Sequence, residues 1–207
     1  MDTSKFVVIE GSEGAGKSTA IKFIQKIIES HGEKVVLARE PGGTPMAEDL
    51  RTVIKSATVD EKVDPRTELL IMYAARVQLF ENVIRPALEA GSFVICDRFF
   101  YSTWAYQGGG RELGLDIIKP IHELCLGDVA PGLTIYMDID PELGLERARG
   151  RGALDRFELE QISFFHRTRA MYRKLCEERV EMVEIDASQK LEEVQKDLSS
   201  VLDSYLN

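Results

Sequence analysis

Phe6-Val7-Val8-Ile9-Glu10-Gly11-Ser12-Glu13-Gly14-Ala15-Gly16-Lys17-Ser18 is the stretch that decides the fold. Its second part, Gly11–Ser18, fits the pattern G-x-x-x-x-G-K-[ST], which is typical of loops that bind phosphate groups. The first part, Phe6–Glu10, predicts a buried strand, and the amphipathic pattern after the loop predicts a helix that stops near Gly32. In such a unit, glycines let backbone N–H groups turn towards phosphate oxygens, and the helix N-terminus adds positive charge. The stretch therefore predicts a P-loop rather than an ordinary glycine-rich turn.

The residue types in this loop predict how a nucleotide is held. The predicted ATP-binding residues are Gly11, Ser12, Glu13, Gly14, Ala15, Gly16, Lys17, Ser18 and Thr19. Lys17 is expected to bridge the β- and γ-phosphates, and the Ser18 hydroxyl is expected to ligate Mg²⁺. Asp97 follows the apolar run Phe93–Cys96, so it places a carboxylate at the carboxyl end of a predicted strand, where α/β sheets bind ligands. We interpret Asp97 as a metal-site residue, with a simple turn residue as the alternative.

Short apolar runs alternate with helical patterns along the chain. The predicted strands are Phe6–Glu10, Val35–Leu37, Phe93–Cys96, Leu133–Ile139 and Val180–Ile185. The first four runs are typical of strands buried on both faces. The alternation predicts an α/β P-loop NTPase fold, with a five-stranded parallel sheet flanked by helices on both faces. The length suits a single domain over residues 1–207, because no long linker divides the chain.

Composition and charge narrow the range of partners. Asp and Glu number 35 against 26 Lys and Arg, which gives a net charge of −9 and argues against a nucleic-acid partner. No apolar run has the length of a membrane helix, so no membrane partner is expected. The N-terminal residues lack a basic leader with a hydrophobic core, which predicts a cytoplasmic location.

Missing motifs narrow the kind of P-loop protein. The guanine-reading motif N-K-x-D is impossible because the only asparagines are Asn82 and Asn207, and the switch motif D-x-x-G is absent. A GTPase switch is therefore disfavoured, and a small-molecule kinase is favoured. A P-loop regulatory or assembly protein is the alternative from another class; it would hydrolyse ATP without regard to any acceptor. A nucleic-acid-processing ATPase conflicts with the charge and the size.

One arginine lies on an apolar helix face. The stripe at helical spacing consists of Leu69, Met72, Tyr73, Phe80 and Val83, and Arg76 falls in line with it. A buried guanidinium needs an anion or carbonyl acceptors, so we interpret Arg76 as a ligand-binding residue. The alternative is a buried stem whose charged head reaches solvent.

A second set of arginines lies in the segment RARGRGALDR. It consists of Arg147, Arg149, Arg151 and Arg156. Gly150 and Gly152 predict mobility, so residues from about 147 to 158 suit a lid that closes over ATP and spreads transition-state charge. The alternative is a solvated helix end whose arginines pair with neighbouring glutamates.

Together these motifs resemble the thymidylate kinases of bacterial type over essentially the whole chain. The motifs are IEGSEGAGKS (9–18), REPGGT (39–44), AEDLR (47–51), YAARVQ (73–78), DRFFYSTWAYQGGGR (97–111) and RARGRGALDRFE (147–158). The resemblance implies transfer of the γ-phosphoryl group of Mg·ATP to dTMP, which gives dTDP and ADP for dTTP biosynthesis and DNA synthesis. It also implies a homodimer built on helices, including the stripe around Leu69 to Val83. Kinases of a deoxynucleoside, of dUMP or of a broader set of pyrimidines are the nearest alternatives.

The resemblance also implies roles in phosphate binding. Arg51 of the AEDLR segment would hold the acceptor phosphate, and Arg98 would lie between acceptor and donor phosphates. Relatives with an arginine inside the P-loop differ from this chain, which has Glu13 there and its arginines in the lid. The implied catalytic residues are therefore Lys17, Arg98, Arg149 and Arg151, and the lid motif does not say which arginine reaches the phosphates.

The remaining implied roles concern the nucleoside. Arg76 looks like the arginine that reads a pyrimidine carbonyl, and Thr103 and Gln107 look like the pair that reads the rest of the thymine edge. The position that is aromatic in many relatives is Met72 here, so either Met72 or Tyr73 would pack on the base.

The sugar and the metal complete the implied site. Tyr106 would pack near the sugar 2′ position, where it disfavours a ribonucleotide. Glu13 and Glu40 look like acidic groups near the acceptor sugar and the metal, so the implied metal-site residues are Ser18, Asp97 and Glu40.

Overall fold

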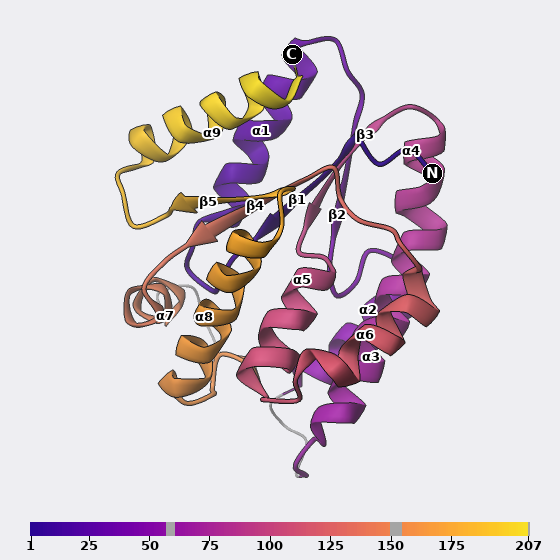
Figure 1. The fold of residues 1–207 in the computed structure, drawn as a ribbon, viewed down its shortest axis with the longest axis vertical. Helices are drawn as coiled ribbons and strands as arrows, with labels where there is room; N and C mark the ends of the chain where they lie inside the picture. The colour runs from indigo at the N-terminus through magenta and orange to yellow at the C-terminus, as the bar shows by residue number, and fades with distance from the viewer. Residues whose placement is uncertain (57–60, 150–154, 207) are drawn as a thin grey trace.

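The computed structural model describes residues 1–56, 61–149 and 155–206 and contains one five-stranded parallel sheet. Its strands are β1 (Phe6–Glu10), β2 (Val35–Arg39), β3 (Phe93–Asp97), β4 (Leu133–Asp138) and β5 (Met182–Asp186). The strand order is β2-β3-β1-β4-β5, as Figure 1 shows. The α/β prediction with five parallel strands is confirmed.

The register of the strands gathers their carboxyl ends at one edge of the sheet. Ile9 of β1 pairs with Asp97 of β3 and with Ile135 of β4, and Arg39 of β2 also pairs with Asp97. The strand order reverses on either side of β1, so the loop after β1 emerges where α/β sheets bind ligands.

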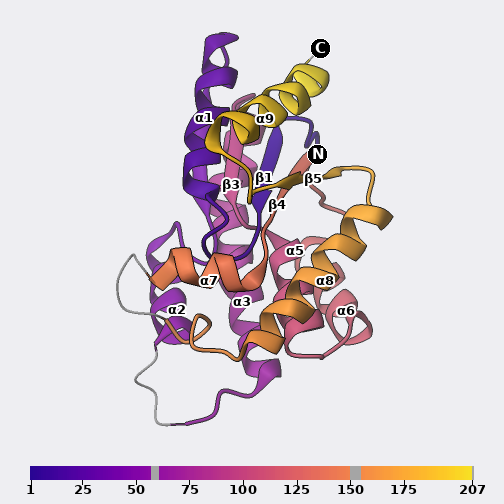
Figure 2. The same ribbon diagram turned by 90° about the vertical axis from the view of Figure 1, so that its left-hand side faces the viewer.

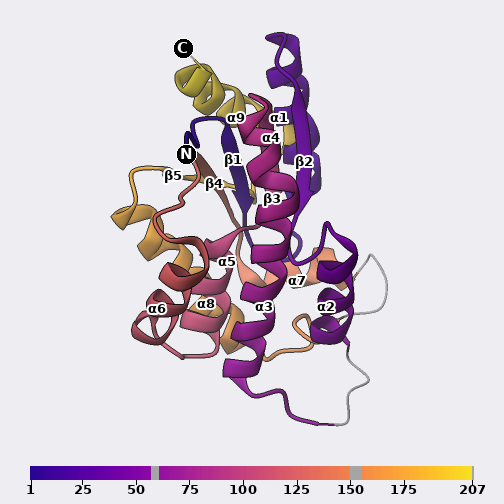
Figure 3. The ribbon, with the colours of Figure 1, turned by 90° about the vertical axis from the view of Figure 1, so that its right-hand side faces the viewer.

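Helices cover both faces of the sheet (Figures 2 and 3). They are α1 (Lys17–Ser30), α2 (Pro45–Lys55), α3 (Pro65–Leu79), the π-helical η1 (Phe80–Ile84), α4 (Arg85–Glu89), α5 (Phe100–Thr103), the π-helical η2 (Trp104–Gly110), α6 (Leu115–Leu126), α7 (Pro141–Arg149), α8 (Ile162–Glu178) and α9 (Leu191–Leu206). Successive residues of β1 point to opposite faces: Val7 and Ile9 pack with α1 and α9, while Phe6 and Val8 pack with α3 and α8. Both sides of the central strand are therefore buried, as predicted.

Two strand predictions need correction. β2 is an edge strand whose residues are exposed or half-buried, so the prediction that it is buried on both faces is wrong. The predicted fifth strand began at Val180, but this residue is fully exposed in the turn before β5. In both places a β-branched run lies at the margin of the sheet, where composition alone does not reveal that one side is open.

The apolar stripe on α3 and η1 faces the interior of the chain. Leu69, Met72, Tyr73 and Phe80 all belong to the buried core on the α3 side of the sheet. A dimer contact on α3 would therefore have to use its opposite face. Among the described residues, no helix has both the length and the apolar composition that a bilayer span requires.

Candidate active site

The P-loop forms a tight turn between β1 and α1. Gly11, Gly14 and Gly16 have φ angles of 145°, 77° and 81°, and Gly16 is the left-handed residue that precedes α1. Lys17 folds back over this turn, and its Nζ atom donates hydrogen bonds to Gly11 O at 2.9 Å and Ser12 O at 3.1 Å. The N-terminus of α1 and a lysine amine are thereby held together, as an anion site requires.

The amine of Lys17 is destabilised in its charged form. Burial and the nearby Arg98 guanidinium lower the pKa of Lys17 to about 8, although Asp97 and Glu13 act in the opposite direction. A bound phosphate group would supply the missing counter-charge.

A cavity of about 280 Å³ opens beside the P-loop. The predicted residues that line it are Glu13, Gly14, Ala15, Gly16, Lys17, Ser18, Thr19, Glu40, Arg51, Met72, Asp97, Arg98, Tyr106 and Gln107. Gly11, Ser12, Tyr73, Arg76 and Thr103 lie outside its wall, and Arg151 lies outside the described residues. Most of the predicted site residues therefore line the same cavity.

Asp97 and Ser18 both line this cavity. Asp97 Oδ1 is buried and has no hydrogen-bond partner, and Ser18 is exposed at the start of α1. Among the described residues there is no cluster of three or more His, Cys, Asp or Glu that could hold a metal. The carboxylate of Asp97 and the hydroxyl of Ser18 suit a cation such as Mg²⁺, which is usually bound by one or two protein ligands together with substrate phosphates.

Arg98 connects the P-loop to the helical segment that follows β3. Its backbone has a φ of 71°, an unusual value for a residue with a Cβ atom. Its guanidinium donates to Glu13 Oε1 at 2.8 Å, to Ser102 Oγ at 3.2 Å and to Tyr106 OH at 3.2 Å. Burial raises the pKa of Glu13, but Arg98 and Lys17 outweigh this effect and lower it overall. Backbone strain at a partly buried arginine with several hydrogen-bond partners is typical of a functional position.

The other cations on the cavity wall differ in how they are paired. Arg39 binds Glu48 at 2.9 Å, and Lys55 binds Asp155 at 2.6 Å. Arg51 donates to Pro41 O at 2.8 Å, and no carboxylate of the described residues lies within ion-pair distance of it. Burial lowers the pKa of Arg51, and the neighbouring Arg39 contributes to this shift. Arg51 is therefore well placed to receive an anion.

Arg76 is buried, as predicted, but it meets a protein anion. Its Nε and Nη2 atoms donate to both carboxylate oxygens of Glu40 at 2.6–3.1 Å, and Nη2 also donates to Phe99 O. Its side chain is 0% exposed, which excludes the alternative that its head reaches solvent. Nη1 has no partner among the described residues, so its two N–H donors are still free.

Met72 and Tyr73 differ in their position relative to the cavity. Met72 lines the cavity, whereas the Tyr73 ring lies beneath the Arg76 guanidinium at 4.9 Å and is buried. Of these two residues, Met72 is the one that a ligand in the cavity can contact. Thr103 Oγ1 and Gln107 Oε1 are buried and unpartnered.

The predicted lid arginines separate into different environments. Arg149 is exposed at the end of α7, while Arg147 donates to Ala187 O at 3.1 Å. Arg156 donates to Glu68 Oε2 at 2.6 Å, so it is paired, although not with the glutamates next to it in sequence. Residues 150–154 lie outside the described residues, and the predicted lid is anchored at its C-terminal end.

A second cavity, of about 290 Å³, lies on the other side of the P-loop. It shares Ala15, Gly16 and Thr19 with the first cavity and adds Arg147, which the sequence analysis placed in the lid, together with residues that it did not assign. The unassigned residues are Ala20, Phe23, Met137, Ala187, Gln189, Leu191, Val194, Gln195 and Leu198. The position of Ala187 and Gln189 after a strand end is the signal that could have identified this cavity.

Other residues of the first cavity were not predicted individually. They are Arg39, Pro41, Lys55 and Ser102, and from the predicted lid segment Asp155, Phe157 and Glu158. Arg39 ends a strand, so its position at the carboxyl end of the sheet could have identified it, as it did Asp97. Lys55 and Asp155 are 100 positions apart and form an ion pair only in the folded chain, so the sequence gives no signal for them.

Comparison with known proteins gives consistent results. The family model described as thymidylate kinase matches residues 9–198. The thymidylate kinase of Vibrio parahaemolyticus serotype O3:K6 is 50% identical over 100% of this chain and 99% of its own length. The thymidylate kinase of Photobacterium profundum is 51% identical over 99% of this chain and 98% of its own length. The thymidylate kinase of Legionella pneumophila (strain Paris) is 47% identical, with 99% and 96% covered.

Proposed function

Because the chain belongs to the thymidylate kinase family, we propose that it binds its two substrates in the two cavities around its P-loop. There it transfers the γ-phosphoryl group of ATP to dTMP, giving dTDP and ADP. The observation that carries this assignment to the site is Arg51. Its guanidinium lies on the same cavity wall as the P-loop and has no acid partner in the part of the chain that the structure describes, which suits an acceptor that already carries a phosphate group. A kinase of an unphosphorylated nucleoside would not need it.

ATP would enter with its phosphates on the P-loop and its adenosine in the second cavity. The two cavities share Gly16 and Thr19, so one nucleotide can extend from one into the other. Arg147, held at Ala187 O, would then border the base. The lid from about residue 147 to 158 would close over the triphosphate, within a single domain.

Ser18 and Asp97 are the residues that would hold Mg²⁺. The free buried oxygen of Asp97 and the accessible hydroxyl of Ser18 fit a hard cation, whereas both oxygens of Glu40 are engaged by Arg76. When bound, the metal would neutralise charge on the β- and γ-phosphates. Glu40 therefore serves the site mainly by holding Arg76.

The acceptor would lie with its phosphate between Arg51 and Arg98 and its base near Met72. Gln107 lines this cavity and has an unpartnered amide oxygen. Arg76 Nη1 and Thr103 Oγ1 lie behind the cavity wall, where they are also unpartnered among the described residues, and a base that extends past Met72 would meet them. This arrangement supports the roles that the resemblance implies.

Tyr106 and Glu13 would border the acceptor sugar. The Tyr106 hydroxyl donates to Glu13 at 2.8 Å, so it is fixed beside the P-loop. A fixed ring at this place suits discrimination against a 2′-hydroxyl group.

The chemistry requires positioning and charge neutralisation rather than a general base. The acceptor phosphate is already largely ionised at neutral pH, so no proton has to be removed before attack. Lys17 and Arg98 would stabilise the charge that spreads over the transferred group, together with Arg149 or Arg151 from the lid. Changing both lid arginines to Ala should lower turnover more than ATP affinity.

A coupled ADP-release assay tests the proposal. With Mg·ATP present, the acceptors to compare are dTMP, dUMP, dCMP, dGMP, dAMP, thymidine and none. We expect strong dependence on dTMP and no response to thymidine. ADP release that ignores every acceptor would reduce the protein to a P-loop ATPase and remove the acceptor-site assignments.

We further propose a homodimer in the cytoplasm. α3 and α6 pack beside one another (Figure 3) and expose Leu70, Ile117 and Leu124, of which Leu124 is 87% exposed. Exposed leucines on adjacent helices are typical of an interface between copies. A solution mass of two chains, reduced to one by Leu124→Glu, is the expected result.

A further inference from the structure

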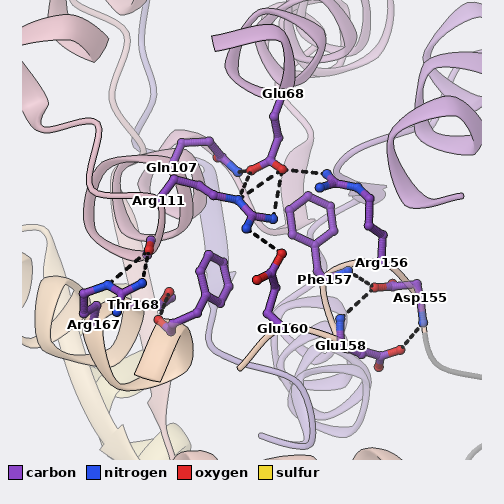
Figure 4. A network of polar contacts seen from close by, with 12 residues as sticks. Glu68, Gln107, Arg111, Asp155, Arg156, Phe157, Glu158, Glu160, Arg167 and Thr168 are labelled. Atoms are coloured by element: carbon purple, nitrogen blue, oxygen red, sulfur yellow. Dashed lines mark hydrogen bonds and ion pairs between the residues drawn. The ribbon is translucent and has the colours of Figure 1, made fainter. Parts of the chain in front are cut away.

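Glu68 is a buried carboxylate at the start of α3 that no part of the proposed reaction uses. Its side chain is 0% exposed, and it does not line the active-site cavity. Nevertheless it accepts hydrogen bonds from three side chains of distant segments: Gln107, Arg111 and Arg156 (Figure 4). A carboxylate with this many partners fixes the orientation of the groups around it.

The contact with Gln107 determines which way its amide faces. A carboxylate paired with arginines accepts hydrogen bonds but donates none, so the amide atom 2.7 Å from Glu68 Oε1 must be the NH₂ group of Gln107. The amide oxygen is then turned away from Glu68, and it is buried without a partner. Because Gln107 lines the cavity, the polar atom that it can offer a ligand there is an acceptor.

Two arginines hold Glu68 in this role. Arg111 donates to both carboxylate oxygens at 3.1–3.3 Å and also binds Glu160 at 2.5 Å. Arg156 donates to Glu68 at 2.6 Å and to Ile54 O at 2.9 Å. Figure 4 shows that these contacts surround one carboxylate from several directions. Glu68 therefore has little freedom to release Gln107 and to let its amide rotate.

We propose that Glu68 is a positioning residue that sets base specificity by locking the Gln107 amide with its oxygen towards the acceptor base. An acceptor at this place favours a pyrimidine with an N–H donor at N3, as in thymine and uracil, and disfavours cytosine, whose N3 is an acceptor. The free Nη1 donor of Arg76 matches the O4 carbonyl of the same bases. This inference rests on the proposed function, because it requires the base to lie against Gln107.

The test compares the affinities of dTMP and dCMP, measured by calorimetry or by competition. In Glu68→Gln, the new side chain carries both a donor and an acceptor, so the Gln107 amide can adopt either orientation. We expect the preference for dTMP over dCMP to narrow about tenfold, which corresponds to about 1.4 kcal/mol. If Glu68 had only a structural role, the affinities for dTMP and dCMP would fall equally and their ratio would stay unchanged. That result would overturn the proposal.

Glu160→Gln serves as the control. It removes the other partner of Arg111 but contacts neither Gln107 nor the cavity, so it should keep the wild-type ratio. A narrowed ratio in this control would contradict the proposal.

One further measurement covers the case in which Glu68→Gln does not fold. In the wild-type protein with dTMP, the Gln107 side-chain N–H that donates to Glu68 should exchange slowly with solvent, because it remains hydrogen-bonded. Gln107→Met identifies its NMR signal. Rapid exchange would overturn the inference. A wild-type protein that binds no dTMP would instead refute the proposed function, so the two failures are distinguishable.

Discussion

Gly144 determines how close α7 lies to the P-loop, and Gly144→Ala tests this directly. A Cβ atom at position 144 would fall 2.6 Å from Glu13 O, and one at Gly14 would fall 2.0 Å from Gly144 O. The backbones must therefore separate by about 0.4 Å to reach the closest tolerated contact at 3.0 Å, and by about 0.8 Å to reach an ordinary contact at 3.4 Å. The obstructing atoms belong to backbone, so no side-chain rotation can relieve the clash.

The expected result of Gly144→Ala is a loss of turnover with little loss of stability. Alanine favours a helix over glycine by about 1 kcal/mol, which offsets part of an overpacking cost of about 1–3 kcal/mol. A displacement approaching 1 Å of groups that position the phosphates can lower the rate by about 10²-fold. Steady-state kinetics and thermal melting separate these effects, with Glu146→Ala on an exposed part of the same helix as the control. Wild-type kcat and ATP affinity in Gly144→Ala would refute the reasoning.

Three further outcomes are expected from the same geometry. Lys17→Ala should abolish phosphoryl transfer while the thermal midpoint stays close to that of the wild type; retained activity in the coupled assay would remove Lys17 from the mechanism. The pKa of Lys17 in the free protein is about 8, and bound phosphate favours the charged form of its amine. ATP binding at pH 9 should therefore take up a proton, and ATP affinity should fall as the pH rises. Calorimetry in two buffers of different ionisation enthalpy measures this proton uptake. Met72→Phe should tighten dTMP binding by up to about tenfold, since an aromatic contact contributes about 0.5–1.5 kcal/mol; unchanged or weaker affinity would show that the base does not lie on this residue.

The parts of the fold and the site that are encoded locally could be predicted from the sequence. The P-loop needs glycines, a lysine and a hydroxyl within eight positions, and Asp97 needs only a buried run before it. The sequence therefore predicted both, and Lys17, Ser18 and Asp97 line the same cavity. The number and direction of the strands followed from alternating patterns. The openness of β2 could not be predicted in this way, because it depends on which strand lies at the edge of the sheet.

The parts that depend on distant pairing were not predictable. Arg76 was correctly placed inside, but its partner Glu40 is 36 positions away and was assigned to the sugar and the metal instead. Glu68 gives no signal at all, since an acidic residue in the first turn of a helix usually interacts only with the helix dipole. Its partners lie 39, 43 and 88 positions away, so only the folded chain reveals its role.

The charge arrangement of the cavity also explains how an acidic chain can hold two anionic nucleotides. A net charge of −9 opposes the approach of phosphates, and most cations on the cavity wall are already paired with acids of the chain. These pairs fix the directions of the guanidinium groups before any ligand binds, so little side-chain entropy has to be lost on binding. Among the described residues, Arg51 has no acid partner within ion-pair distance, and Lys17 lacks full compensation for its own charge. Attraction for anions is thus concentrated at these two positions, where the proposed function places the acceptor and donor phosphates.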